Sequence, residues 1–252
     1  MQFEIDNKKA IANRGNLFRL KQVMRRAEAG EPVKVGFIGG SITMGCLATE
    51  PELCYAYRVY EWWQEKFPKT EVSYINAGIG ATTSQFAAAR VEKDLLDQKP
   101  DVVFVEFSVN DDANEFFMET YESLIRKIYT FDQNTAIIII NCVRYDDGGS
   151  AEVWHAKVAR YYELPQISMQ RSIYPEVAVG RISAEEITAD YLHPNDIGHK
   201  LVAGVIESFL EEVYTEREQK EAEAEEKAPL TEASYQHAVR YRNDNCDPVI
   251  TG

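Results

Sequence analysis

Four residues in this chain have side chains whose types and spacing suit nucleophilic chemistry. Ser41 follows a short apolar run and a Gly-Gly pair, Asn110 follows a second apolar run, and Asp190 precedes His193 by three residues. A serine hydroxyl attacks a carbonyl carbon when a histidine accepts its proton, and a carboxylate holds that histidine in the productive tautomer. An asparagine amide can donate a hydrogen bond to the oxygen that becomes negative in such a reaction. These residue types therefore indicate acyl transfer, provided that the fold brings them together.

Each candidate also has a purely structural interpretation, and the residues alone leave both open. Serines after Gly-Gly are common in loops, and Ser41 lies in no GxSxG, GxGxxG or P-loop motif. The pair of Asp190 and His193 also suits a surface cap on the following helix, and Asn110 suits an ordinary turn. Gly78, within Asn-Ala-Gly-Ile-Gly, is a turn glycine or, if it lies beside Ser41, an N–H donor to an oxyanion.

The cysteines and the remaining histidines show no spacing typical of a metal site. No CxxC motif occurs, so we expect free thiols in a reducing compartment, no metal ion and no cofactor. His199 lies inside a helical pattern and is expected to be structural, whereas His155 is open between packing and substrate contact. The cysteines are Cys46, Cys54, Cys142 and Cys246.

The charge of the chain argues against two classes of partner. A formal charge of −14 at pH 7 repels both nucleic-acid phosphates and anionic membrane surfaces. No apolar run approaches the roughly 20 residues of a membrane span, and the first nine residues lack the apolar core of a signal peptide. We therefore expect no nucleic-acid or membrane partner and a cytoplasmic location. A homo-oligomer is compatible with the sequence.

Apolar runs with β character alternate with amphipathic helical patterns along most of the chain. Four consecutive isoleucines in the fourth run are typical of a strand that is covered on both faces, as in parallel sheets. The alternation predicts right-handed crossovers and a three-layer α/β/α sandwich. The predicted strands are 33–38, 72–75, 102–105, 136–143 and 166–169, and the predicted helices are 16–29, 55–67, 84–97, 116–131, 151–163 and 198–214.

The composition changes after Tyr214. Residues 216–227 are almost all Glu, Lys, Arg, Gln and Ala, which is typical of a solvated helix end or a linker. Residues 235–250 have weak strand character and predict either an added strand or the start of a second domain. We therefore divide the chain into a domain at 1–214 and a charged helix or linker with a C-terminal tail at 215–252.

Taken together, these motifs resemble those of the SGNH hydrolases, the GDSL-type esterase superfamily, named for a serine, a glycine, an asparagine and a histidine in four blocks. The blocks fall on Ser41 in Phe-Ile-Gly-Gly-Ser, Gly78 in Asn-Ala-Gly-Ile-Gly, Asn110 in Ser-Val-Asn-Asp and His193 in Asp-Tyr-Leu-His-Pro. The resemblance implies that Ser41 is the nucleophile, that His193 is the base and that Asp190 orients His193. It also implies an oxyanion hole formed by the Ser41 N–H, the Gly78 N–H and the Asn110 side chain.

The resemblance covers residues 33–214 and implies a flavodoxin-like sheet of five parallel strands in the order 2-1-3-4-5. Two blocks depart from the family pattern. Gly-Gly-Ser replaces the usual Gly-Asp-Ser, and Ser-Val-Asn-Asp replaces the usual Gly-x-Asn-Asp. Neither departure removes a catalytic group, although the missing aspartate bears on how the Ser41 loop is held.

The Gly-Gly-Ser-Ile-Thr form, together with Tyr-Tyr-Glu-Leu-Pro at 161–165, looks like the branch that contains carbohydrate acetylesterases. This resemblance implies a metal-independent serine esterase that removes short acyl groups, acetyl above all, from oligo- or polysaccharides. Members of that branch often carry a β-rich second domain, which would account for the last segment. Two alternatives stay open: a thioesterase, lysophospholipase or arylesterase of the same fold, and a catalytically silent carbohydrate-binding protein.

Overall fold

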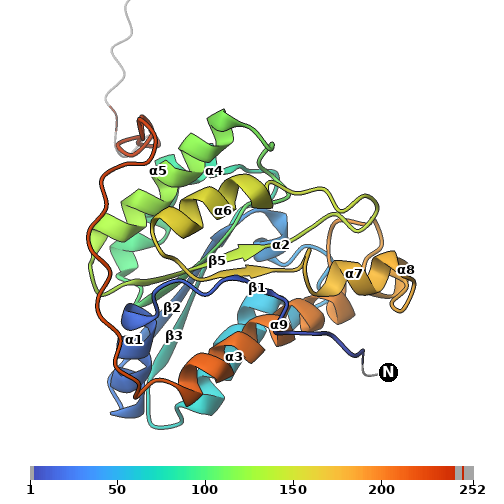
Figure 1. Ribbon diagram of the computed structural model, residues 1–252, viewed down its shortest axis with the longest axis horizontal. Helices are drawn as coiled ribbons and strands as arrows, with labels where there is room; N and C mark the ends of the chain where they lie inside the picture. The colour runs from blue at the N-terminus through green and yellow to red at the C-terminus, as the bar shows by residue number, and fades with distance from the viewer. Residues whose placement is uncertain (1–2, 242–245, 247–252) are drawn as a thin grey trace, which may run out of the picture.

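One six-stranded sheet lies at the centre of the computed structural model, which describes residues 3–241 and 246 (Figure 1). Its strand order is β1-β6-β5-β4-β2-β3, and every neighbouring pair is parallel except β1 and β6. The strands are β1 Ile11–Asn13, β2 Val33–Gly39, β3 Val72–Gly78, β4 Val102–Glu106, β5 Ala136–Asn141 and β6 Gln166–Ser168. The mixed α/β class predicted from the sequence is confirmed.

The sheet does not match the predicted five strands exactly, because it has a sixth. β1 pairs antiparallel with β6 at its edge, with Ile11 opposite Ile167 and Asn13 opposite Gln166. The five parallel strands run β3-β2-β4-β5-β6 beside it. β1 coincides with no strand predicted from the sequence, and its pairing with β6 is what defines it.

Helices cover both faces of the sheet (Figure 1). The described α-helices are α1 Phe18–Glu28, α2 Ser41–Met44, α3 Tyr55–Lys66, α4 Ser84–Asp94, α5 Glu115–Phe131, α6 Glu152–Tyr161, α7 Ile173–Ala178, α8 Ala184–Ile187 and α9 Asp196–Thr215. The sequence did not predict α2, α7 and α8, which have six residues or fewer and too few turns to show a helical period. In the described part of the chain, no helix combines the length and apolarity that a bilayer crossing requires.

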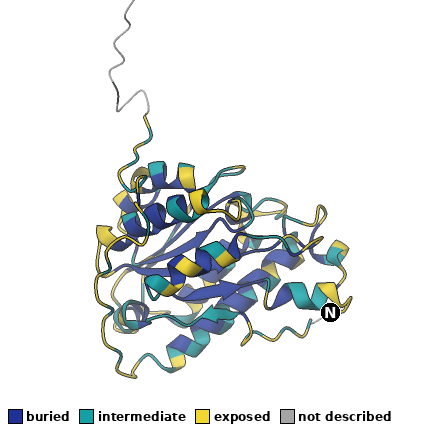
Figure 2. Ribbon diagram, turned by 45° about the horizontal axis from the view of Figure 1, so that its top comes forward, coloured by how far each residue is buried: buried dark blue, intermediate teal, exposed yellow. Residues whose placement is uncertain are grey.

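The four isoleucines of β5 explain how the core divides into two layers. Successive strand side chains point to opposite faces, so Ile138 and Ile140 pack with α1, α3 and α9, whereas Ile137 and Ile139 pack with α4, α5 and α6. All four are buried, and the sheet is covered on both sides (Figure 2). Burying each such side chain contributes roughly 1.5–3 kcal/mol relative to exposure. The core therefore fixes the strand register on which the polar edge of the sheet depends.

The C-terminal segment, residues 217–241, forms no helix or strand and runs along the molecule from the end of α9 to α5 and α4 (Figure 1). Glu221 accepts hydrogen bonds from the Leu17 backbone N–H and the Lys21 ammonium group, at 2.8 and 2.7 Å. On α5, the buried Glu122 carboxylate accepts the Thr231 backbone N–H at 2.7 Å. The charged stretch is thus a bound, irregular segment rather than a helix.

The predicted added strand is wrong for residues 235–241, which are turn and irregular chain. Residues 242–245 and 247–252, the rest of that prediction, lie outside the described residues. The boundary between 1–214 and 215–252 and the accessory domain stay predictions.

Candidate active site

Three strand ends meet at the edge of the sheet where β2 leads into α2. Gly39, the last residue of β2, is level with Gly78 of β3 on one side and with Glu106 of β4 on the other. Ser41 follows two residues later as the first residue of α2, so its backbone N–H has no carbonyl acceptor within the helix. The order and register of the parallel strands therefore bring the serine, glycine and asparagine blocks to one edge.

The loop before α9 brings His193 and Asp190 to the same edge. The Ser41 Oγ lies 2.8 Å from the His193 Nε2, and the His193 Nδ1 lies 2.6 Å from the Asp190 Oδ2. Because the carboxylate can only accept, Nδ1 carries the proton and Nε2 is free to accept the serine proton. The predicted serine, histidine and aspartate thus form one continuous hydrogen-bonded chain.

The Asp190 carboxylate is held as an anion by its surroundings. Partial burial alone would raise its pKa, but hydrogen bonds from the His193 ring and from the His193 and Leu192 backbone N–H groups lower the pKa to about 2. The two backbone bonds reach Oδ1 at 2.8 and 3.0 Å. Tyr191, the residue after Asp190, has a left-handed backbone conformation with φ of +61°. This tight turn brings the Asp190 carboxylate back onto the His193 ring, whose other nitrogen faces Ser41.

Contacts from α9 tie the histidine loop to the serine loop. The Asp196 carboxylate accepts the backbone N–H and the hydroxyl of Thr49, both at 2.8 Å. One turn later the buried His199 donates to the Cys46 carbonyl at 3.2 Å and accepts the Tyr55 backbone N–H at 3.3 Å. Burial lowers the pKa of His199 to about 4, so this residue is neutral and structural.

Gly40 makes room for the side chain of Asn110. A Cβ on Gly40 would lie 2.3 Å from the Asn110 Oδ1, so the amide packs directly on the backbone that precedes Ser41. Among the described residues, neither the Oδ1 nor the Nδ2 of Asn110 has a hydrogen-bond partner, and the Oδ1 is buried. An amide that is placed against the nucleophile with its donor unused suits hydrogen bonding to a substrate oxygen.

Gly78 lies beside α2 in a different way from the prediction. A Cβ on Gly78 would lie 2.4 Å from the Met44 backbone nitrogen, so only glycine permits this approach of β3 to α2. Its own N–H already donates to the Asn76 Oδ1 at 2.9 Å. A Cβ on Gly80, two residues on, would lie 3.8 Å from the Ser41 Cβ. Donation from the Gly78 N–H to an oxyanion stays a prediction, and it requires that the bond to Asn76 be shared or released.

A buried carboxyl group lies beneath this edge. Glu106 is fully buried, and its Oε1 accepts the backbone N–H and the hydroxyl of Ser108 at 3.0 and 2.9 Å. Burial outweighs these two bonds and raises the pKa of Glu106 to about 7. No group of three or more His, Cys, Asp or Glu side chains within the described residues is placed to hold a metal ion.

The structure brings Ser41, Asn110, Asp190 and His193 together, and it places Gly78 next to α2 with its N–H already bonded. Sequence reasoning missed the contact between Gly40 and Asn110. The only signal for it was the second glycine before the serine, where the family pattern has an aspartate.

The comparisons with known proteins identify the family of this chain. A family model described as the GDSL-like Lipase/Acylhydrolase family matches residues 37–201, a range that contains all the residues of the site. An acetylxylan esterase from Geobacillus stearothermophilus is 24% identical over 212 residues, which is 73% of this chain and 95% of that protein.

Solved structures extend the comparison, one of them at higher identity. A two-domain esterase active on acetylated mannans superposes with a TM-score of 0.94 at 54% identity, covering 96% of this chain. The chain spans 65% of the length of that esterase, which was also crystallised with mannopentaose. A structure of an acetylxylan esterase from G. stearothermophilus shares the fold, with a TM-score of 0.57 at 21% identity over 73% of this chain and 96% of that one. The chain therefore belongs to the GDSL-like lipase/acylhydrolase family.

Proposed function

We propose that this protein is a serine esterase that hydrolyses O-acetyl esters on oligo- or polysaccharides. The observation that carries the reaction type is the chain of hydrogen bonds from the Ser41 Oγ through the His193 ring to Asp190. A partly buried serine hydroxyl with a tautomer-fixed imidazole on one side is the arrangement required for nucleophilic acyl transfer.

In the first step the Ser41 Oγ attacks the carbonyl carbon of the ester while the His193 Nε2 accepts its proton. The carbonyl oxygen becomes negative, and His193 gives the proton to the departing sugar hydroxyl when the C–O bond breaks. In the second step His193 takes a proton from a water molecule, whose oxygen attacks the acyl-serine. The bond between the acyl carbon and the Ser41 Oγ then breaks, acetate leaves, and His193 returns the proton to Ser41. Asp190 stabilises the imidazolium cation that exists between the two proton transfers.

We further propose that the Asn110 amide and the Ser41 N–H stabilise the oxyanion. Asn110 lies on the backbone of Gly40, immediately before the nucleophile, and its Nδ2 makes no hydrogen bond within the described residues. Donors that are already in place cost no reorganisation when the charge develops. The Gly78 N–H is the third predicted donor, subject to its present bond to Asn76.

The saccharide substrate is supported by similarity. At 53–54% identity over 96% of this chain, the two-domain esterase active on acetylated mannans makes the same class of substrate the strongest candidate here. Because this chain spans 65% of that protein, we extend the proposal to acetylated mannans as a class and not to a particular acetyl position. The cytoplasmic location, the flavodoxin-like fold type and a homo-oligomeric state stay predictions.

The test is acetate release from acetylated manno- and xylo-oligosaccharides, measured beside 4-nitrophenyl acetate and 4-nitrophenyl octanoate. We expect release from the saccharides and a preference for the acetyl over the octanoyl ester. Ser41→Ala should lower turnover by about 10⁶-fold, since it removes the nucleophile. Faster turnover of the octanoyl ester would favour the lysophospholipase or thioesterase alternatives. No labelling of Ser41 by a fluorophosphonate probe would favour the silent carbohydrate-binding protein.

A further inference from the structure

A second aspartate–histidine pair lies inside the protein, close to the edge that carries the site. The His155 Nε2 lies 3.1 Å from the Asp111 Oδ2, and both side chains are fully buried. Asp111 directly follows Asn110, whereas His155 comes from α6, so the pair joins the loop after β4 to a helix on one face of the sheet. The Tyr121 ring stacks on the imidazole, with ring centroids 3.6 Å apart.

The hydrogen bonds around His155 fix its tautomer. The Gln166 amide donates to the Asn141 Oδ1 at 2.7 Å, so the Asn141 Nδ2 donates in turn to the His155 Nδ1 at 3.3 Å. Nδ1 is therefore an acceptor, and the proton lies on Nε2, which donates to Asp111. This order of donors and acceptors gives the Asp111 carboxylate one defined donor from α6.

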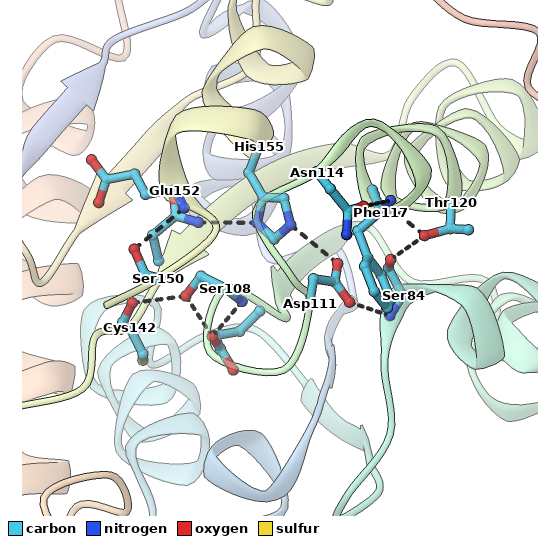
Figure 3. A network of polar contacts seen from close by, with 12 residues as sticks. Ser84, Ser108, Asp111, Asn114, Phe117, Thr120, Cys142, Ser150, Glu152 and His155 are labelled. Atoms are coloured by element: carbon cyan, nitrogen blue, oxygen red, sulfur yellow. Dashed lines mark hydrogen bonds and ion pairs between the residues drawn. The ribbon is translucent and has the colours of Figure 1, made fainter. Parts of the chain in front are cut away.

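Asp111 also holds the start of α4. Its Oδ1 accepts the Ser84 backbone N–H at 2.9 Å, and the Ser84 hydroxyl bonds to Thr120 of α5 at 2.7 Å (Figure 3). On the other side of the same loop, the Ala151 N–H donates to the Ser108 carbonyl at 2.7 Å. Asp111 thus connects the Asn110 loop to α4 and α6 at once.

We propose that Asp111 and His155 are positioning residues that hold the Asn110 amide in line with the oxyanion. This inference rests on the proposed function of Asn110. Because both side chains are fully buried, neither touches substrate, and their effect on the reaction passes through the loop 107–111. A displacement of about 1 Å at a catalytic group can cost as much as 10²-fold in rate, so loosening this loop lowers kcat without removing any reacting atom.

Two variants of nearly equal polarity test the proposal. A Gln amide nitrogen reaches about as far as the imidazole Nε2, so His155→Gln keeps a donor to Asp111. His155→Asn reaches only as far as Nδ1 and loses that bond. We expect His155→Asn to lower kcat for 4-nitrophenyl acetate by about 10-fold to 100-fold with KM within about twofold, and His155→Gln to recover most of the loss.

A double-mutant cycle with Asn110→Ala separates a positioning role from a general loss of structure. Asn110→Ala alone should cost roughly 10²–10³-fold in kcat. If His155 acts through Asn110, His155→Asn should cost less than about twofold in the Asn110→Ala background. Costs that simply multiply would overturn the proposal. So would a His155→Asn protein with a lower Tm and the kcat of the wild type.

The controls keep the outcomes distinct. Val158→Ala opens a cavity at another buried position of α6 and should lower Tm without changing kcat. If His155→Asn does not fold, Asp111→Asn replaces it in the cycle, because that isosteric variant keeps the acceptor for Ser84 and loses the acceptor for His155. An Asn110→Ala enzyme as active as the wild type would refute the proposed oxyanion donor itself. A costly Asn110→Ala with a multiplicative cycle would refute only the positioning role.

Discussion

Among the residues that the structure describes, two hydrogen-bonded aspartate–histidine pairs have opposite surroundings. The pair of Asp190 and His193 lies at the surface, with side chains that are 46% and 18% exposed, and the second imidazole nitrogen faces the Ser41 hydroxyl at 2.8 Å. The pair of Asp111 and His155 is fully buried, and the second nitrogen accepts an amide hydrogen from Asn141. The same two residue types therefore serve proton transfer in one place and loop placement in the other.

The group that faces the second imidazole nitrogen decides which role an aspartate–histidine pair has. An imidazole nitrogen that faces a hydroxyl can take its proton, whereas one that accepts from an amide donor has no proton to take at neutral pH. Solvent access matters as well, because substrate and water must reach the nitrogen that carries the proton. Proximity of aspartate to histidine, at 2.6 or 3.1 Å, does not by itself indicate catalysis.

Breaking the exposed pair should have the largest effect on turnover. In Asp190→Asn the new amide donates to the His193 Nδ1, which moves the ring proton to Nε2 and prevents it from accepting the serine proton. We expect kcat to fall by about 10⁴-fold. Because the Asp190 side chain is 46% exposed, Tm should change little. Steady-state kinetics and thermal denaturation of the same preparation check both expectations.

Asp111→Asn is the matched change in the buried pair. Compared with Asp190→Asn, we expect a larger loss of stability and a smaller loss of kcat. It leaves a buried donor of His155 without an acceptor, which costs roughly 1–3 kcal/mol of folding free energy. The loss in kcat should not exceed that of His155→Asn. A larger loss of turnover from Asp111→Asn than from Asp190→Asn would mean that the roles of the two pairs are interchanged.

Gly40→Ala should lower turnover less than Asp190→Asn does, because it disturbs the packing of Asn110 rather than the proton transfer. The added Cβ would lie 2.3 Å from the Asn110 Oδ1 and must displace the amide. We expect kcat to fall by about 10-fold to 100-fold, less than for loss of the Asn110 amide itself. Gly204→Ala on α9 is the control, because a Cβ there meets nothing within 4 Å. Equal activity of the two variants would show that Asn110 tolerates the displacement.

Glu106 is a buried carboxyl group whose hydrogen bonds come from Ser108 and, among the described residues, from no histidine. Burial raises its pKa from 4.5 in the unfolded chain to about 7 in the folded protein, so the folded state holds the proton more tightly. This group's contribution to stability is therefore full below about pH 4.5 and is lost as the pH rises to about 7, by roughly 3 kcal/mol.

Glu106→Gln removes that titration and should have the smallest effect on turnover. The Tm of the variant relative to the wild type should rise between pH 4.5 and pH 8, with kcat at pH 8 within about twofold of the wild type. Differential scanning calorimetry across this pH range checks the slope. A Tm difference that is flat with pH would show that Glu106 titrates alike in the folded and unfolded states.

Much of the fold was predictable because its signals are local. The five parallel strands and the six long helices follow from apolar periodicity, and their ends mostly lie within three residues of the prediction. β1 was not predictable, because it is defined by its pairing with β6, which lies more than 150 residues away in the sequence. The contacts of the charged segment after α9 were not predictable, because a run of Glu and Lys looks the same whether it is solvated or bound, as Glu221 is to Lys21 of α1.

The sequence by itself determined the chemistry that is available: a serine after Gly-Gly, an asparagine after a strand, and an aspartate three residues before a histidine. The spacing of Asp190 and His193 is local, so one turn of chain suffices to join them. Only the tertiary structure decided three contacts: the His193 ring hydrogen-bonds to Ser41, the Asn110 side chain packs against Gly40, and the buried His155 ring hydrogen-bonds to Asp111. Each of these contacts joins separate elements, and their distances depend on strand register and helix packing, which no local pattern encodes.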